Sequence, residues 1–173
     1  MTVTPGRPCP TCGSVAIDPP LCYGAEAPWR LLGVTEAEFD KRVDLTADQC
    51  VVDEQQFFIR GHVILPIVGS QETFAWSVWC SLSEQSFLHA CERWFVPERV
   101  GDRPYFGWLL TSLPCYPETL HLKTSVQSRN VGVVPAVTLE PSDHPLSVEQ
   151  RSGVTMDRIR GFAHEVLHAT SGA

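Results

Sequence analysis

The stretch GFAHEVLHA, near the end of the chain, contains a pattern that is typical of zinc peptidases. His164, Glu165 and His168 spell H-E-x-x-H. On a helix the two histidines lie one turn apart on the same face, so both imidazoles can bind one zinc ion while the glutamate polarises a bound water. A catalytic zinc also needs a third protein ligand, and residues 169–173 include no His, Cys, Asp or Glu.

An upstream cysteine would have to complete this zinc site. Peptide deformylases have a similar length and place H-E-x-x-H near the C-terminus after a cysteine ligand, a place that Cys80, Cys91 or Cys115 could formally take. The chain lacks the glycine-rich and Glu-Gly-Cys motifs of those enzymes. We therefore expect His164 and His168 to flank the buried face of the last helix, and a small zinc-dependent hydrolase is the alternative hypothesis.

The segment CPTCG near the start carries a second metal signal. Cys9 and Cys12 are separated by two residues, with a proline and a glycine that favour the tight turn of a tetrahedral zinc site. A closed site needs two further ligands, for which Cys22, Cys50 or a histidine are the candidates. The sequence thus predicts a structural zinc site, with a metal-free segment and a redox pair as the other interpretations.

Composition and charge limit the classes of partner. The formal net charge of −7 disfavours nucleic acids and anionic membranes, which a negatively charged surface repels. The chain has no apolar run long enough to cross a bilayer and no signal peptide, which favours a cytoplasmic protein. Its seven cysteines are then thiols or metal ligands rather than a disulfide framework. At 173 residues we expect one domain, residues 1–173, with residues 1–30 as an irregular, knuckle-like segment packed on it.

Hydrophobic periodicity indicates the elements that must position these residues. Residues 50–83 are rich in β-branched and aromatic residues and predict a hairpin with its loop at 69–72. Further strands are expected at 105–113, 120–128 and 136–140. Helices are expected at 35–43, 83–95, 143–151 and from 155 onward, with caps at Thr35, Ser83, Asp143 and Thr155 and a stop at Gly153. These elements predict an α+β fold, mainly an antiparallel sheet packed by helices, with a C-terminal helix.

The aromatic residues of the strands are expected in the core. Trp76 and Trp79 are an odd number of positions apart, so on a regular strand they face opposite sides of the sheet. Both faces must then be covered, or one tryptophan lines a ligand or partner surface. Tyr105, Phe106 and Trp108 are more typical of core than of a binding platform.

Several stretches together resemble one bacterial family. They are CPTCG, YGAEAP, DQCVVDEQQFFIRGHVILPI, FAWSVWCSLSEQSF, PYFGWL, YPETLHLKTSV and LEPSDHPLSVEQRSGVT. The chain resembles the family named domain of unknown function 2199, which has no established activity. The resemblance implies a histidine at the position of Ala16, so Cys22 would have to supply that metal ligand. It also implies that His164 and Glu165 are particular to this chain, which weakens the peptidase hypothesis.

The family-like stretches contain polar residues that could form a cleft. Arg60 and Lys123 are candidates to bind an anionic group, together with His144. His144 and Glu149 could exchange a proton. Glu165 is a catalytic candidate only through the H-E-x-x-H motif of the zinc-hydrolase alternative. The structural interpretation is that the cations extend from a sheet into solvent and that Glu149 forms an ion pair.

No complete catalytic constellation can be assembled from neighbouring residues. We therefore expect a non-catalytic binding or regulatory module that recognises a protein or a small-molecule ligand, with zinc confined to a structural role. A pocket enzyme that uses His144 and Glu149, or the zinc-dependent hydrolase, is the alternative. An acidic surface suits a basic partner.

Overall fold

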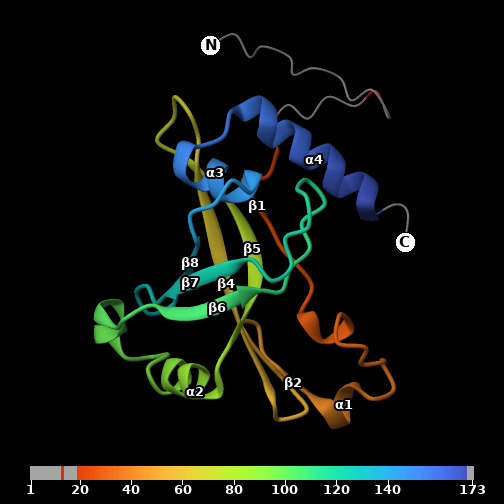
Figure 1. Cartoon of the computed structure of the whole chain (residues 1–173), viewed down its shortest axis with the longest axis vertical. Helices are drawn as coiled ribbons and strands as arrows, with labels where there is room; N and C mark the ends of the chain where they lie inside the picture. Colours follow the sequence, from red (N-terminus) through yellow and green to blue (C-terminus); the bar gives the residue numbers. More distant parts are fainter. Residues whose placement is uncertain (1–12, 14–18, 171–173) are drawn as a thin grey trace.

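A computed structural model describes Gly13 and residues 19–170, and the side chains of residues 167–170 are not part of this description. The predicted zinc ligands Cys9 and Cys12, and the side chain of His168, therefore lie outside the described residues. Figure 1 shows strands in the middle of the molecule, with two helices at one end and a small strand and helix pair at the other. No helix among the described residues has both the length and the apolar character needed to cross a membrane.

The centre of the fold is a closed barrel of five strands, each paired with the next along the chain. The strands are β4 (Gln56–Pro66), β5 (Thr73–Leu82), β6 (Tyr105–Leu109), β7 (Lys123–Gln127) and β8 (Ala136–Leu139). The first four pairings are antiparallel, whereas β8 returns to pair with β4 in parallel. The α+β class is confirmed, but the predicted plain antiparallel sheet is wrong because the parallel pairing closes it.

Two glycines within strands permit this closure. A Cβ on Gly61 of β4 would lie 2.6 Å from Cγ2 of Val137, so β8 could not approach β4 as closely. A Cβ on Gly107 of β6 would lie 2.7 Å from the carbonyl oxygen of Ser81 on β5. Glycine inside a strand often marks such a close approach of two backbones. These residues therefore let the strands curve tightly around a small core.

Three shorter strands extend the sheet beyond the barrel. β1 (Cys22–Tyr23) pairs in parallel with β5, and β3 (Gln49–Val52) pairs with β4. β2 (Val43–Leu45) pairs with β3 and forms the edge of the eight-stranded sheet. Next to it lies α1 (Phe39–Arg42), a single helical turn that is shorter than the predicted helix over 35–43. The expected pairing of Thr35 with Glu38 does form, since the Thr35 N–H donates to Glu38 Oε2 at 2.9 Å.

Two apolar clusters cover the two faces of the strands. Trp76 is 2% exposed and belongs to the main cluster, which fills the barrel and continues beneath the C-terminal helices. Trp79 is 3% exposed and packs outside the barrel with Trp29 of the short 3₁₀ helix η1 (Pro28–Arg30). The prediction that both sides of β5 are covered is therefore confirmed, since both tryptophans are almost fully buried.

The helices begin and end where local capping allows. Ser83 caps α2 (Glu84–Glu92) by accepting the Ser86 N–H at 3.2 Å, as predicted. A 3₁₀ helix, η2 (Pro97–Gly101), follows. Gly153, at φ 84°, ends α3 (Pro145–Ser152), and Thr155 accepts the Arg158 N–H at the start of α4 (Met156–Thr170).

The predicted cap of α3 is wrong by one residue. His144 rather than Asp143 is the N-cap, because its Nδ1 accepts the Leu146 N–H at 3.2 Å. A side chain of α3 also bonds to backbone groups of β8. The side chain of Gln150 accepts from the Leu139 N–H and donates to the Val137 carbonyl, each at 2.8 Å. The helix is thus tied to the strand that closes the barrel.

Candidate functional site

Two aromatic side chains lie exposed on the outer wall of the barrel. Phe106 is 56% exposed and Trp108 39% exposed, and their rings meet edge to face at 5.3 Å. Along β6 the residues alternate in burial, with Tyr105, Gly107 and Leu109 facing inward. The prediction that Phe106 and Trp108 belong to the core is therefore wrong, since the alternation of a strand sends them outward.

A groove of about 520 Å³ lies on one side of Trp108. We call it the Gln55 groove, after the residue of the β3–β4 turn at its rim. Its lining is Leu32, Gln55, Gln56, Phe57, Phe58, Ser81, Leu82, Trp108, Leu110 and His121. Apolar side chains dominate, and none of the lining residues is Asp, Glu, Lys or Arg. Such a surface suits an apolar group that also accepts or donates a few hydrogen bonds.

A second groove of about 310 Å³ lies on the other side of the same tryptophan. We call it the Glu140 groove, and its lining is Trp108, His121, Leu122, Lys123, Leu139, Glu140, Pro141 and Ser142. Here Lys123 Nζ lies 3.5 Å from Glu140 Oε2, and both side chains are about half exposed. Because Trp108 and His121 line both grooves, the two form one track across a shared ridge.

His121 is held on this ridge by an unusual backbone conformation. Its φ of 64° is left-handed, a region that non-glycine residues seldom adopt and that often occurs at functional sites. The His121 N–H donates to the Leu109 carbonyl at 2.7 Å, which continues the pairing at the end of β6. The backbone at position 121 is therefore held at the end of β6, and it places His121 in the lining of both grooves with Trp108.

Buried hydroxyls make the preceding loop rigid. The Thr119 hydroxyl donates to the Thr111 carbonyl at 2.7 Å and accepts the Leu113 N–H at 3.0 Å. The Thr111 hydroxyl in turn accepts the Trp79 N–H at 2.8 Å. Thr111 and Thr119 are 4% and 1% exposed, so water does not compete for these bonds. The loop that carries His121 is thus preorganised, which lowers the entropic cost of binding a ligand.

The predicted catalytic carboxylates lie elsewhere, in a polar cluster between α3 and α4. Glu149 Oε2 accepts from the Tyr116 hydroxyl at 2.5 Å, and its Oε1 accepts from Arg158 Nε at 3.0 Å. Glu165 Oε1 lies 3.9 Å from the same guanidinium. The structure therefore places Glu149 and Glu165, which belonged to two separate catalytic hypotheses, on either side of Arg158, and Glu149 is already engaged.

The raised pKa values in this cluster keep Tyr116 and Cys115 protonated, so they act as neutral hydrogen-bond donors and not as nucleophiles. Burial, with the hydrogen bond to Glu149, raises the pKa of Tyr116 far above its ordinary value. Burial, followed by the charge and hydrogen bond of Glu165, raises the pKa of Cys115 to about 12. At neutral pH both groups are protonated, so the thiol is not activated as a nucleophile. The cluster is well suited to join the C-terminal helix to the barrel.

His144 lies at the edge of this cluster. Its ring centre is 6.5 Å from that of Tyr116, and its Nδ1 is occupied as the cap of α3. Within the described residues no hydrogen bond joins His144 to Glu149, so the proposed proton exchange has no direct route there. His164 is half-buried on α4, one residue before Glu165.

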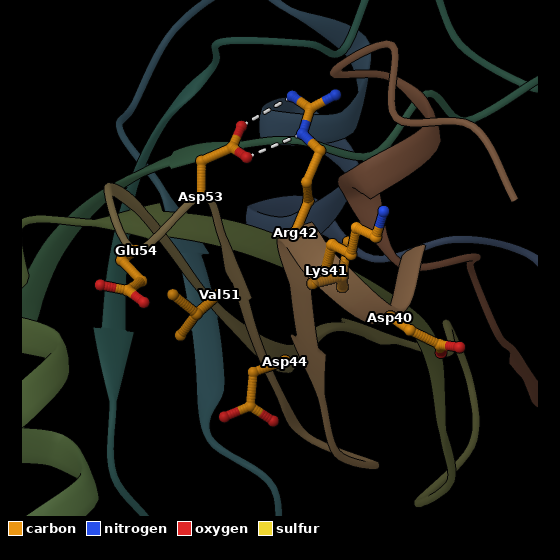
Figure 2. Close-up of a pocket in the computed structure, with 8 residues that line it drawn as sticks. Asp40, Lys41, Arg42, Asp44, Val51, Asp53 and Glu54 are labelled. Atoms are coloured by element: carbon orange, nitrogen blue, oxygen red, sulfur yellow. Dashed lines mark hydrogen bonds and ion pairs between the residues drawn. The ribbon is translucent and has the colours of Figure 1, made fainter. Parts of the chain in front are cut away.

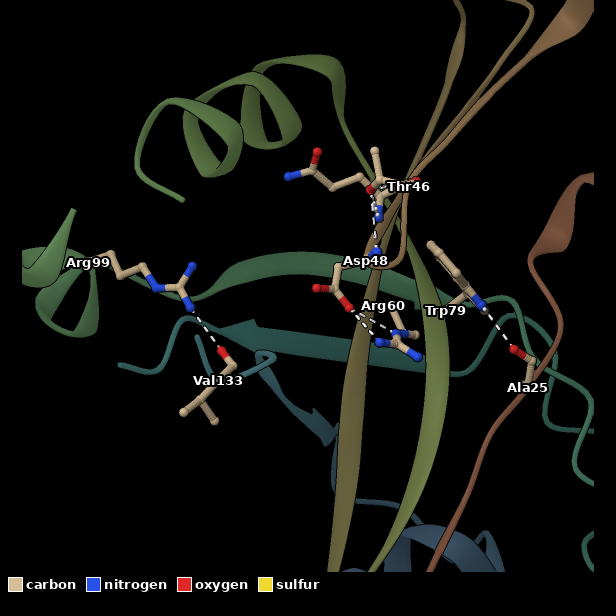
Figure 3. A network of polar contacts seen from close by, with 8 residues as sticks. Ala25, Thr46, Asp48, Arg60, Trp79, Arg99 and Val133 are labelled. Carbon is tan, nitrogen blue, oxygen red and sulfur yellow. Dashed lines mark hydrogen bonds and ion pairs between the residues drawn. The ribbon is translucent and has the colours of Figure 1, made fainter. Parts of the chain in front are cut away.

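The two predicted anion-binding cations have separate carboxylate partners. Arg60 donates to Asp48 Oδ1 from Nε at 3.0 Å and from a terminal nitrogen at 2.7 Å (Figure 3). Lys123 faces Glu140 in the groove described above. Arg60, Lys123 and His144 therefore lie in three different polar environments, and only Lys123 contributes to the track.

The four predicted zinc ligands do not form one set. Cys22 is exposed on β1 and pairs with Ala75 of β5, which in turn pairs with Ile64 of β4. Cys50 of β3 pairs directly with Phe58 of β4. Ile64 and Phe58 are about 20 Å apart along the strand, at roughly 3.3 Å per residue. Cys22 and Cys50 therefore cannot bind the same ion. Burial also raises the pKa of Cys50 to about 11.

Among the described residues, no group of three or more His, Cys, Asp or Glu side chains could hold a metal ion. Those residues include neither Cys9 and Cys12 nor the side chain of His168. A zinc site that uses them stays a prediction.

Comparison with known proteins assigns the chain to a family. Residues 8–154 match the family described as "Uncharacterized protein conserved in bacteria (DUF2199)". Because this match covers most of the chain, the chain belongs to that family. Searches of curated proteins and of solved structures returned no significant match.

Proposed function

We propose that this member of the DUF2199 family is a non-catalytic binding module that holds an extended segment of a partner protein against the outer wall of its barrel. The observation that carries the proposal is the exposed Trp108, which forms a ridge between two grooves on a rigid strand. An exposed tryptophan beside a concave apolar surface is typical of the residues that dominate binding energy at interfaces.

The form of the track favours an extended peptide over a compact metabolite. The Gln55 and Glu140 grooves are open hollows on either side of one ridge, so a ligand that fills both must cross Trp108 and His121. A peptide in an extended conformation can place alternate side chains in the two hollows. Small-molecule sites, in contrast, enclose most of the surface of their ligand.

The lining of the Gln55 groove indicates which side chain anchors the segment. With no Asp, Glu, Lys or Arg in its lining, this groove would leave a charged side chain without an ion-pair partner of those types. An aromatic residue or a proline can instead pack on Trp108 while Gln55, Gln56 and His121 supply hydrogen bonds to the peptide backbone. Lys123 and Glu140 suit a polar residue in the second groove.

The polar cluster around Arg158 supports a role without catalysis. Both carboxylate oxygens of Glu149 accept hydrogen bonds from neighbouring side chains, and the raised pKa values keep Tyr116 and Cys115 neutral. Groups that satisfy one another in this way act as a structural tie.

A random peptide library displayed on phage tests the proposal. The full-length protein and its Trp108→Ala variant would be used to select peptides, whose affinities are then measured by calorimetry. We expect enriched peptides to share an aromatic or proline anchor and to bind Trp108→Ala at least about tenfold more weakly, a loss of about 1.4 kcal/mol. The Phe95→Ala variant is the matched control, because Phe95 is 81% exposed and lies outside both grooves. Peptides that bind Trp108→Ala as tightly as the unaltered protein would refute the proposal.

A further inference from the structure

The outer edge of β2 is an unpaired strand edge with a defined set of free backbone groups. β2 ends the strand order of the sheet and pairs only with β3 among the described strands. The Asp53 N–H donates to the Arg42 carbonyl, and the Thr46 N–H donates to the Gln49 carbonyl. Since the direction of hydrogen bonding alternates along an antiparallel strand, Arg42, Asp44 and Thr46 bond inward to β3.

The residues between them must direct their backbone groups outward. The Leu45 N–H and the carbonyl groups of Val43 and Leu45 therefore point away from β3, while the Val43 N–H is taken by the Phe39 carbonyl. One donor and two acceptors are enough to receive a short added strand. Peptides bind exposed sheet edges in this manner, with backbone hydrogen bonds that supply affinity.

A hollow of about 400 Å³ beside this edge is lined by more acidic than basic residues (Figure 2). Its lining includes the four acidic residues Asp40, Asp44, Asp53 and Glu54, together with Lys41 and Arg42. Arg42 is already bound: Nε and a terminal nitrogen each lie 2.7 Å from an oxygen of Asp53, and Glu38 approaches at 3.2 Å.

The remaining carboxylates are available to a partner. Asp40, Asp44 and Glu54 are exposed, with Lys41 as the one neighbouring cation of the lining that has no ion pair within the described part of the chain. Figure 2 shows Asp44 and Glu54 extending beside Val51 on the face of β2 and β3 that borders the hollow. A basic side chain that reaches this face meets carboxylates and an apolar residue.

We propose that the open edge of β2 binds a basic, extended segment of a partner protein by strand addition. The backbone of the segment pairs with Val43 and Leu45, and its lysine or arginine side chains lie over Asp44 and Glu54. A second copy of this chain is a poor occupant, because its own β2 would place Asp44 against Asp44. The inference does not depend on the track around Trp108, which lies on β6.

Fluorescence anisotropy with a labelled Lys-Val-Lys-Val-Lys-Val peptide, at about 0.15 M salt, tests this inference. We expect saturable binding that weakens at least about tenfold when alternate backbone nitrogens of the peptide are methylated, since methylation removes donors but keeps the charge. Asp44→Lys should weaken binding by a similar factor. Leu45→Pro, which removes the one outward donor, should also weaken it.

The control variants separate this site from general charge attraction and from the Trp108 track. Glu92→Lys makes the same change of charge on the exposed end of α2 and should alter affinity by less than about twofold. Trp108→Ala should leave binding of this peptide unchanged. Equal affinity of the methylated peptide, equal loss with Glu92→Lys, or no saturation up to about 1 mM peptide would each overturn the inference.

Discussion

Replacement of Arg99 should destabilise the protein more than replacement of any exposed arginine. Arg99 is only 2% exposed, yet among the described residues its guanidinium forms no ion pair with a carboxylate. It donates instead to four backbone carbonyls, those of Arg129 at 2.6 Å, Trp94 at 2.7 Å, Val133 at 2.8 Å (Figure 3) and Asn130 at 3.0 Å. The guanidinium also stacks over the Trp94 ring at 5.0 Å.

The expected loss in the free energy of unfolding follows from the carbonyl groups that lose their hydrogen-bond donor when Arg99 is replaced. Arg99→Met deprives four carbonyl groups of a donor, at about 1 kcal/mol each. Residues 130–133 are exposed, so water can hydrogen-bond to carbonyl groups there and offset about 1 kcal/mol of this cost. We therefore expect the free energy of unfolding to decrease by about 3 kcal/mol. Arg99→Lys keeps the charge but has only three donors for four carbonyl groups, and should cost about 1 kcal/mol.

Urea unfolding monitored by tryptophan fluorescence measures both values. Arg103→Met is the control, because Arg103 is exposed and its replacement should change the free energy of unfolding by less than about 0.5 kcal/mol. An Arg99→Met loss below about 1 kcal/mol, at an unchanged dependence on urea, would show that the carbonyl groups do not need the guanidinium and would refute the reasoning.

Two further predictions concern the barrel. Gly107→Ala should lower the free energy of unfolding by about 3 kcal/mol, since the new methyl group meets the Ser81 carbonyl oxygen at 2.7 Å; a thermal unfolding midpoint equal to that of Gly24→Ala, whose methyl group meets no atom, would contradict this. Burial, with the nearby charges of Arg129 and Arg60, lowers the pKa of His62 in the folded protein. The unfolded chain therefore binds more protons below about pH 6.5, and the free energy of unfolding decreases as the pH is lowered. His62→Gln should flatten this fall in urea unfolding between about pH 7 and pH 5, and an unaltered slope would argue against a half-buried neutral imidazole.

The elements themselves could largely be predicted from local sequence. The β-branched and aromatic run over 50–83 forms β3, β4 and β5, and Ser83, Gly153 and Thr155 bound the helices as expected. These features depend on interactions within a few residues, so a window of sequence contains their cause. The cap of α3 shows the limit, because His144 took a place that propensity assigns to Asp143.

Closure of the barrel could not be predicted in the same way. It depends on pairing of His62 with Ala136 and of Val63 with Val137, residues far apart in sequence. A row of hairpins is equally consistent with an open sheet. The glycines at 61 and 107 were signals of close approach, but a glycine does not reveal which strand approaches it.

The candidate binding surface escaped prediction for a related reason. YFGWL contains aromatic or apolar residues on both faces of the strand, so periodicity does not tell the inward face from the outward one. The left-handed backbone of His121 likewise has no marker such as glycine or asparagine at that position. The Glu149 cluster combines three segments that only the fold brings together.

The inward side of β6 is sufficient to explain its place in the barrel. Tyr105 and Leu109 fill the core, and Gly107 permits close contact with β5. The outward residues Phe106 and Trp108 contribute neither to core packing nor to that contact. Polar residues at 106 and 108 would satisfy the same strand without exposing aromatic surface to water. The aromatic pair is therefore unexplained by folding alone, and a partner that covers Trp108 supplies the missing reason. Such a partner also gains from the rigidity of the strand, because little conformational entropy is lost on binding.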